Sequence, residues 1–139
     1  MSETIVEVGH FQTRKTGQAA EGDVFLTRKT EGGRIIAVLS DGLGSGIKAG
    51  VLATLTATMA ARFMAEDIPI RRAAGIIMGT LPVCKVRKIS YATFTIVDAE
   101  SSGAVRIIEY DNPPYLLIRG GKPLEVPKSE IVVKRPKKS

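Results

Sequence analysis

The sequence has very few of the side chains on which zinc binding and covalent catalysis depend. It contains one cysteine, Cys84, one histidine, His10, and no tryptophan. A single cysteine excludes an internal disulfide, and the chain cannot supply the usual Cys and His ligands of a zinc site. A catalytic dyad or triad would have to use His10 or Cys84, and a lone residue of either type is most often structural. Both kinds of chemistry are therefore disfavoured.

Long apolar runs and aromatic clusters are also missing. No apolar run approaches the roughly 20 residues of a membrane span, and the first residues do not open a signal peptide. The formal charge is +6, but the basic residues are dispersed and only 5% of residues are aromatic, which argues against a nucleic-acid surface. We expect a cytoplasmic protein with no membrane or nucleic-acid partner, formed by a domain over residues 1–127 and a basic tail over residues 128–139.

The hydrophobic pattern predicts an α+β domain built on a largely antiparallel sheet. Strands are predicted at residues 4–10, 23–29, 34–39, 90–98, 105–110, 115–118 and 124–126, and helices at residues 47–64 and 70–81. The strands alternate or are rich in β-branched residues, whereas the first helix contains mainly Ala, Leu and Met with no helix breaker except Gly50. Strands, then two helices, then more strands is an order typical of this fold class.

A glycine-rich turn follows the apolar strand at residues 34–39. Its sequence is Ser40-Asp41-Gly42-Leu43-Gly44-Ser45-Gly46, directly before the first predicted helix. Glycines allow the backbone to approach a ligand closely. Asp41 would attract a hard cation, and free N–H groups at the start of a helix suit a phosphate. The turn is therefore the first candidate for a functional site.

A second aspartate, Asp23, is expected close to Asp41. Asp23 begins one predicted strand and Asp41 follows the end of the next, and Glu31-Gly32-Gly33 forms a turn between the two strands. An antiparallel pairing brings both carboxylates to the same end of the sheet. Carboxylates, backbone carbonyls and water are the ligands that Mg²⁺ and Mn²⁺ prefer, so the pair suggests a metal site.

Other interpretations of these motifs remain open. Each aspartate precedes or follows a glycine, and such residues often only cap a turn. The G-x-G-x-G spacing is a weak match to a dinucleotide fingerprint and lacks the following parallel strand, but a nucleotide-binding module stays an alternative. Neither a Walker loop nor an EF-hand fits the turn.

The motifs together resemble the sporulation stage II E branch of the PPM-type, metal-dependent serine/threonine phosphatases. The resemblance rests on Glu21-Gly22-Asp23, on the turn from Ser40 to Gly46, and on the segment from Ile108 to Arg119, which contains Asp111-Asn112-Pro113-Pro114. It extends from Gly22 to about Val126 and covers most of the chain.

The resemblance implies a two-layer antiparallel β-sandwich flanked by helices, with a two-metal Mn²⁺ or Mg²⁺ centre at one end. It implies that Asp41 bridges the metals, that Asp23 is a second carboxylate ligand, and that the Gly42 carbonyl is a backbone ligand. These residues would activate water for the hydrolysis of a phosphoserine or phosphothreonine. The implied partner is a phosphorylated bacterial regulatory protein, for example an anti-sigma-factor antagonist.

The sequence departs from the family pattern at its end. Family members carry another acidic residue in a Ser/Thr-Asp-Gly motif on a later strand, and no such motif follows Val126. We therefore expect a domain that is incomplete at its C-terminus, and a catalytically weak, regulatory protein-binding module is the alternative function. A homodimer formed through the helices or unpaired strand edges is also possible. Arg14, Lys15 and Lys48 are candidates for a phosphate-orienting residue.

Overall fold

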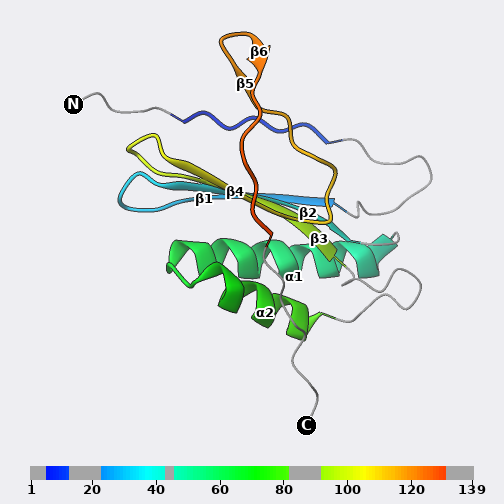
Figure 1. The fold of residues 1–139 in the computed structure, drawn as a ribbon. Helices are drawn as coiled ribbons and strands as arrows, with labels where there is room; N and C mark the ends of the chain where they lie inside the picture. The colour runs from blue at the N-terminus through cyan, green and yellow to red at the C-terminus, as the bar shows by residue number, and fades with distance from the viewer. Residues whose placement is uncertain (1–5, 13–22, 43–45, 82–91, 131–139) are drawn as a thin grey trace.

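The computed structural model describes residues 6–12, 23–42, 46–81 and 92–130. The elements in chain order are β1 (Asp23–Lys29), β2 (Ile35–Gly42), α1 (Gly46–Ala65), α2 (Ile70–Thr80), β3 (Ala92–Ala99), β4 (Val105–Tyr110), β5 (Ile118–Arg119) and β6 (Lys122–Pro123). Strands β1 to β4 form one antiparallel sheet in the order β1-β2-β3-β4, and β5 and β6 form a separate hairpin (Figure 1). The predicted α+β class is confirmed.

The β1–β2 hairpin forms where the sequence predicts it. The Gly33 N–H donates to the Thr30 carbonyl over 3.1 Å, and the Thr30 N–H donates to the Arg34 carbonyl over 2.9 Å. Gly33 has a φ of 80°, which favours glycine because a β-carbon is strained there. This tight turn fixes the register of the two strands that follow each other in sequence.

Both helices lie on the same face of the sheet (Figure 1). Alternate residues of the central strands point to this face and are buried, for example Ile36 and Val38 on β2 and Ile96 on β3. Helix α1 meets them with a row of small buried residues, which let its backbone approach the sheet: Ala49, Ala53, Ala57, Ala60 and Ala61. The core is therefore a sheet and helix layer in direct contact.

The two helices are separated by the predicted break after residue 65. Asp67 takes a left-handed backbone conformation with a φ of 58°, and the Ile68 N–H donates back to the Phe63 carbonyl over 3.0 Å. Pro69 precedes the first turn of α2, where its missing N–H costs nothing. None of the helices in the described ranges is long and apolar enough to cross a bilayer.

The face of the sheet opposite the helices is crossed by irregular segments (Figure 1). Residues 6–12 lie here without strand structure, so the strand predicted at residues 4–10 is wrong for the part that the structure describes. The His10 ring stacks on Phe25 at 4.6 Å between centroids, and the Gln12 side chain donates to the Asp23 carbonyl over 2.8 Å. Side-chain contacts, not a strand ladder, hold this segment.

The last two predicted strands are also wrong in position. Residues 115–117 and 124–126 are irregular, and the strands are the short β5 and β6 on either side of Gly120-Gly121. Both glycines have positive φ, 60° and 77°, so the turn closes immediately around them and the pairing starts next to it. Within the described residues, a second sheet is limited to this hairpin.

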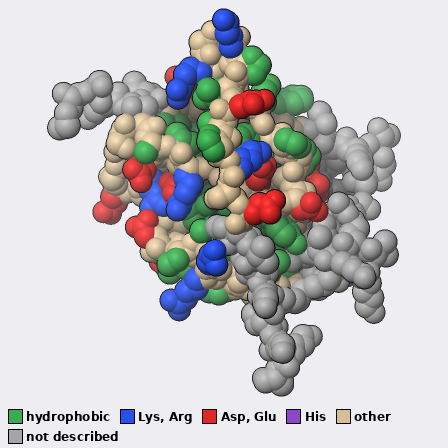
Figure 2. Space-filling model, in the orientation of Figure 1, with side chains coloured by type: hydrophobic (Ala, Val, Ile, Leu, Met, Phe, Trp, Pro, Cys, Tyr) green, Lys and Arg blue, Asp and Glu red, His purple; other side chains and the backbone are tan. Residues whose placement is uncertain are grey.

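Two surface features complete the fold. Acidic and basic side chains are interspersed over the face shown in Figure 2. Helix α1 carries an outward apolar stripe, which we call the α1 stripe and which consists of Ile47, Val51 and Leu55, exposed by 74%, 51% and 46%. These residues are spaced four apart and therefore lie along one side of the helix.

Candidate functional site

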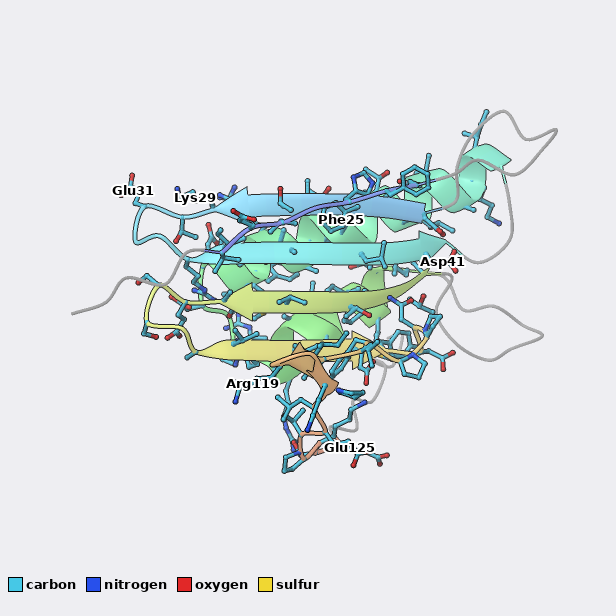
Figure 3. All side chains as sticks on the ribbon, turned by 90° about the horizontal axis from the view of Figure 1, so that it is seen from above. Phe25, Lys29, Glu31, Asp41, Arg119 and Glu125 are labelled. Atoms are coloured by element: carbon cyan, nitrogen blue, oxygen red, sulfur yellow. The ribbon has the colours of Figure 1, made fainter. Side chains whose placement is uncertain are left out.

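The two predicted aspartates meet at one end of the sheet, which we call the Asp41 end. Asp23 and Asp41 are direct cross-strand partners in the β1–β2 pairing, and Figure 3 shows Asp41 at the end of its strand. Direct partners on antiparallel strands project to the same face. This face is the one opposite the helices, because the neighbours Ser40 and Gly42 are buried toward the helices while Asp41 is exposed. The expected proximity of the two residues is confirmed.

Gly42 is a close-packing position at the same end. A β-carbon placed on Gly42 would lie 2.0 Å from the Ala49 carbonyl oxygen and 2.9 Å from the Ala49 α-carbon. Only glycine avoids this clash, since both contacts are with helix backbone. The end of β2 therefore lies directly against the first turns of α1, and the backbone after Asp41 is fixed by packing.

A hydrogen-bond network joins the Asp41 end to the loop after β4. Asn112 accepts a bond from the Thr93 hydroxyl at its Oδ1. Its Nδ2 donates to the Thr95 hydroxyl over 2.9 Å and to the Leu39 carbonyl over 3.3 Å. On the other side, the Ser40 hydroxyl donates to the Thr93 carbonyl over 2.9 Å. Three strand segments are thus tied together by side chains.

Asn112 was not predicted as a site residue from the sequence, where Asp111-Asn112-Pro113-Pro114 contributed only to the family resemblance. The available signal was the position of a hydrogen-bonding amide directly before two prolines, which restrict its backbone. Asp111 also has a positive φ of 54°, so unusual backbone on both sides fixes the direction of the Asn112 side chain.

The residues at the Asp41 end suit a hard cation in the type of their donors. Asp23 and Asp41 offer carboxylate oxygens, and Gly42 offers a backbone carbonyl at a position that a β-carbon cannot occupy. Mg²⁺ commonly uses one or two carboxylates and completes its shell with water. In the described ranges, the Asp41 end included, no group of three or more His, Cys, Asp or Glu side chains gathers as a metal site. The ligand roles of the three residues remain predictions.

The three candidates for orienting a phosphate are unequal in what the structure shows. Lys48 lies in the first turn of α1 and is exposed, at the same end of the sheet as Gly42. Arg14 and Lys15 fall outside the described residues. The structure therefore leaves Lys48 as a candidate by location and does not rank the other two.

The opposite end of the sheet holds a second polar group that was not predicted from the sequence, the hairpin-end cluster of Arg34, Asp67, Asp98 and Arg106. The Arg34 guanidinium bonds both Asp98 carboxylate oxygens over 2.7 Å, Asp67 Oδ1 over 2.6 Å and the Met64 carbonyl over 2.8 Å. Arg106 approaches Asp98 at 3.5 Å. The hydrogen bonds that Arg34 donates to Asp98 raise the pKa of Arg34 most strongly, and the one to Asp67 raises it further, so Arg34 stays charged.

The hairpin-end cluster has the geometry of a structural tie. It connects the start of β2, the end of α1 and the end of β3, and the Asp98 side chain is only 6% exposed. Every charge in it has an opposite partner. The signal in the sequence was an Arg after a glycine turn and an Asp near the end of the next paired strand, but their alignment required the β2–β3 register.

The fold and the paired aspartates define an α+β domain with an acidic corner at one end of its sheet. The model of the family described as Stage II sporulation protein E (SpoIIE) matches residues 31–133, more than half of the chain. This protein therefore belongs to the SpoIIE family, a branch of the PPM-type phosphatases. No curated protein matches the sequence significantly.

Two solved structures show a general similarity to the chain. One is RsbX in complex with magnesium, with 21% identity, a TM-score of 0.49, and coverage of 89% of this chain and 69% of RsbX. The other comes from work on the bacterial stressosome as a modular system adapted to control secondary messenger signaling, with 20% identity and a TM-score of 0.45 over 61% of this chain. This chain spans 40% of the length of that stressosome-related chain.

Proposed function

We propose that this protein is a Mn²⁺- or Mg²⁺-dependent phosphatase domain that removes phosphate from a serine or threonine of a regulatory protein. The observation that carries the proposal is the direct pairing of Asp23 with Asp41 beside the tightly packed Gly42. Membership of the SpoIIE family supports the reaction class. A phosphorylated anti-sigma-factor antagonist is the type of substrate we propose, in a cytoplasmic setting and with residues 1–127 as the domain.

The proposed roles follow from the position of each group. Asp23 and Asp41 would hold the metal and offset its charge, with Asp41 as the shared ligand of two ions, and the Gly42 carbonyl would complete the protein donors. When bound, the metal supplies a Lewis acid that stabilises charge on the phosphoryl oxygens and activates water. Both aspartates are exposed, as a site that acts on a phosphorylated segment of another protein requires.

The first experiment measures Mn²⁺-dependent hydrolysis of a phosphoserine peptide and of p-nitrophenyl phosphate by the wild type and by Asp41→Asn. We expect hydrolysis to require metal and to fall on the order of 100-fold in the variant, because a neutral amide offsets less of the cation's charge. Glu31→Gln is the matched control, since it removes one carboxylate from the exposed hairpin turn at the other end of the sheet (Figure 3). Equal activity of Asp41→Asn and wild type would contradict the proposal.

A second candidate function is a regulatory module that binds the partner protein without turnover. The observation that favours it is the small donor set, two carboxylates and one carbonyl, at the Asp41 end. A folded wild type that binds the phosphorylated partner but shows no metal-dependent hydrolysis would support this candidate over the enzyme. The two candidates share the same surface and differ only in chemistry.

A homodimer remains part of the proposal. The α1 stripe exposes three large apolar side chains in a row, and such patches often mark interaction surfaces. Sedimentation of the wild type beside a variant with Val51→Glu, in the middle of the stripe, decides whether this face pairs two copies.

A further inference from the structure

The Asn112 side chain links three strand segments, whereas a hydrogen bond of the backbone ladder links only two. Its side chain reaches Thr93 and Thr95 on β3 and the Leu39 carbonyl on β2, while it lies itself in the loop that follows β4. The amide uses both its oxygen and its nitrogen. Three neighbouring strands are therefore held at one point, two residues beyond the end of the β4 ladder.

The Thr93 contact leads directly to Asp41. Thr93 is the cross-strand partner of Asp41 on β3, as Asp23 is on β1. Thr93 is only 3% exposed. Removing Asn112 would therefore leave a buried hydroxyl without this hydrogen-bond partner, which costs free energy. The Leu39 contact fixes the same strand two residues before Asp41. Asn112 thus contacts the cross-strand partner of Asp41 and the strand of Asp41 itself, although it is not proposed as a metal ligand.

We propose that Asn112 is a positioning residue that fixes the backbone around Asp41 through Thr93 and Leu39. The inference rests on the proposed function, since Asp41 is taken as the metal ligand. Groups that orient the ligands of a metal typically change its affinity by 10- to 100-fold when they are removed. Because Thr93 stands between Asn112 and Asp41, we expect the lower end of that range.

The test measures Mn²⁺ affinity by calorimetry for the wild type, Asn112→Ala and Thr93→Val. We expect both variants to bind Mn²⁺ about 10-fold more weakly, and the double variant to be no weaker than Asn112→Ala, because the two residues act through one contact. Thr93→Val keeps the size of the side chain and removes only the hydroxyl. It therefore serves as a second probe if Asn112→Ala folds poorly.

The control is Gly33→Ala, which strains the positive φ of the hairpin turn at the far end of β2. A purely structural role predicts that variants with equal losses of melting temperature lose equal Mn²⁺ affinity. The positioning role predicts normal affinity in Gly33→Ala. Unchanged affinity in Asn112→Ala, or an equal loss in Gly33→Ala, overturns the inference.

A metal-free measurement separates this inference from the proposed function. Hydrogen exchange of the backbone amides is measured in the apo protein. The rates at the Asp41 end, residues 38–42 and 92–95, are compared with the rates at the hairpin end of the same two strands. Asn112→Ala is expected to speed exchange selectively at the Asp41 end. If the wild type binds no Mn²⁺, the proposed function fails. In that case, selective faster exchange still supports the fixing of the Asp41 backbone by Asn112, and unchanged exchange overturns it.

Discussion

The two ends of the central sheet differ in how their charged side chains are arranged. At the hairpin end, Arg34 forms ion pairs with Asp67 at 2.6 Å and Asp98 at 2.7 Å. At the Asp41 end, two like charges, Asp23 and Asp41, are placed opposite each other on neighbouring strands, an arrangement that lowers stability. The first end is organised for cohesion. The second places two carboxylates directly opposite each other on an exposed face, which is the arrangement on which the proposed cation site rests.

The largest expected effect is the loss of stability when the hairpin-end cluster loses Arg34. Arg34→Met leaves Asp98 buried without its main partner, because Arg106 reaches it only at 3.5 Å, and we expect a loss of about 3 to 5 kcal/mol in the free energy of unfolding. Urea denaturation measures it. The variant that also carries Asp98→Leu should recover part of the loss, since no buried charge then remains. A loss below that of an exposed ion pair would show that Asp98 is solvated after all.

An intermediate effect is expected at the Asp41 end. Gly42→Ala pushes a methyl group into the backbone of α1 at Ala49, and we expect about 1 to 3 kcal/mol of destabilisation from overpacking, together with loss of Mn²⁺ binding. Gly32→Ala is the matched control, because nothing lies within 4 Å of its added β-carbon. Thermal unfolding and metal titration of both variants give the answer. Identical behaviour of the pair would contradict the close approach of β2 and α1.

The smallest expected effect comes from an exposed ion pair, which serves as a comparison for the buried pair of Arg34 and Asp98. Arg62, in the last turn of α1, bonds Glu66, the first residue after the helix, over 2.7 Å, and the two side chains are 59% and 52% exposed. We expect Arg62→Ala to cost only about 0.3 to 0.5 kcal/mol. Denaturation in low and high salt measures both the cost and its screening. A cost close to that of Arg34→Met would mean that burial is not what makes the hairpin-end cluster strong.

The parts of the fold set by local signals were predictable from sequence. The glycine turn at residues 31–33 and the strands beside it determine which residues pair, so the approach of Asp23 to Asp41 followed from counting positions. The break between the helices followed from Pro69 and the polar residues before it. In each case the residues that decide the structure lie within a few positions of one another.

The parts that depend on distant residues were not predictable. Arg34 and Asp98 meet only because β3 pairs with β2 across both helices, and the contacts of Asn112 require β4 to lie beside β3 in one register. The strand predicted at residues 4–10 failed for a related reason. Its alternation suits a strand, but residues 6–12 contact the sheet through the His10 and Gln12 side chains. No local sequence pattern predicts such contacts.

The hairpin-end cluster also has a consequence for the order in which the chain assembles. Arg34 lies 33 positions from Asp67 and 64 positions from Asp98, so the cluster closes two loops of very different length. Closing the longer loop costs more chain entropy. The β1–β2 hairpin can form before either loop closes, whereas the full set of bonds requires β3 to have joined the sheet. The Arg34–Asp98 bonds can therefore serve as a marker for the pairing of β3 with β2 during folding.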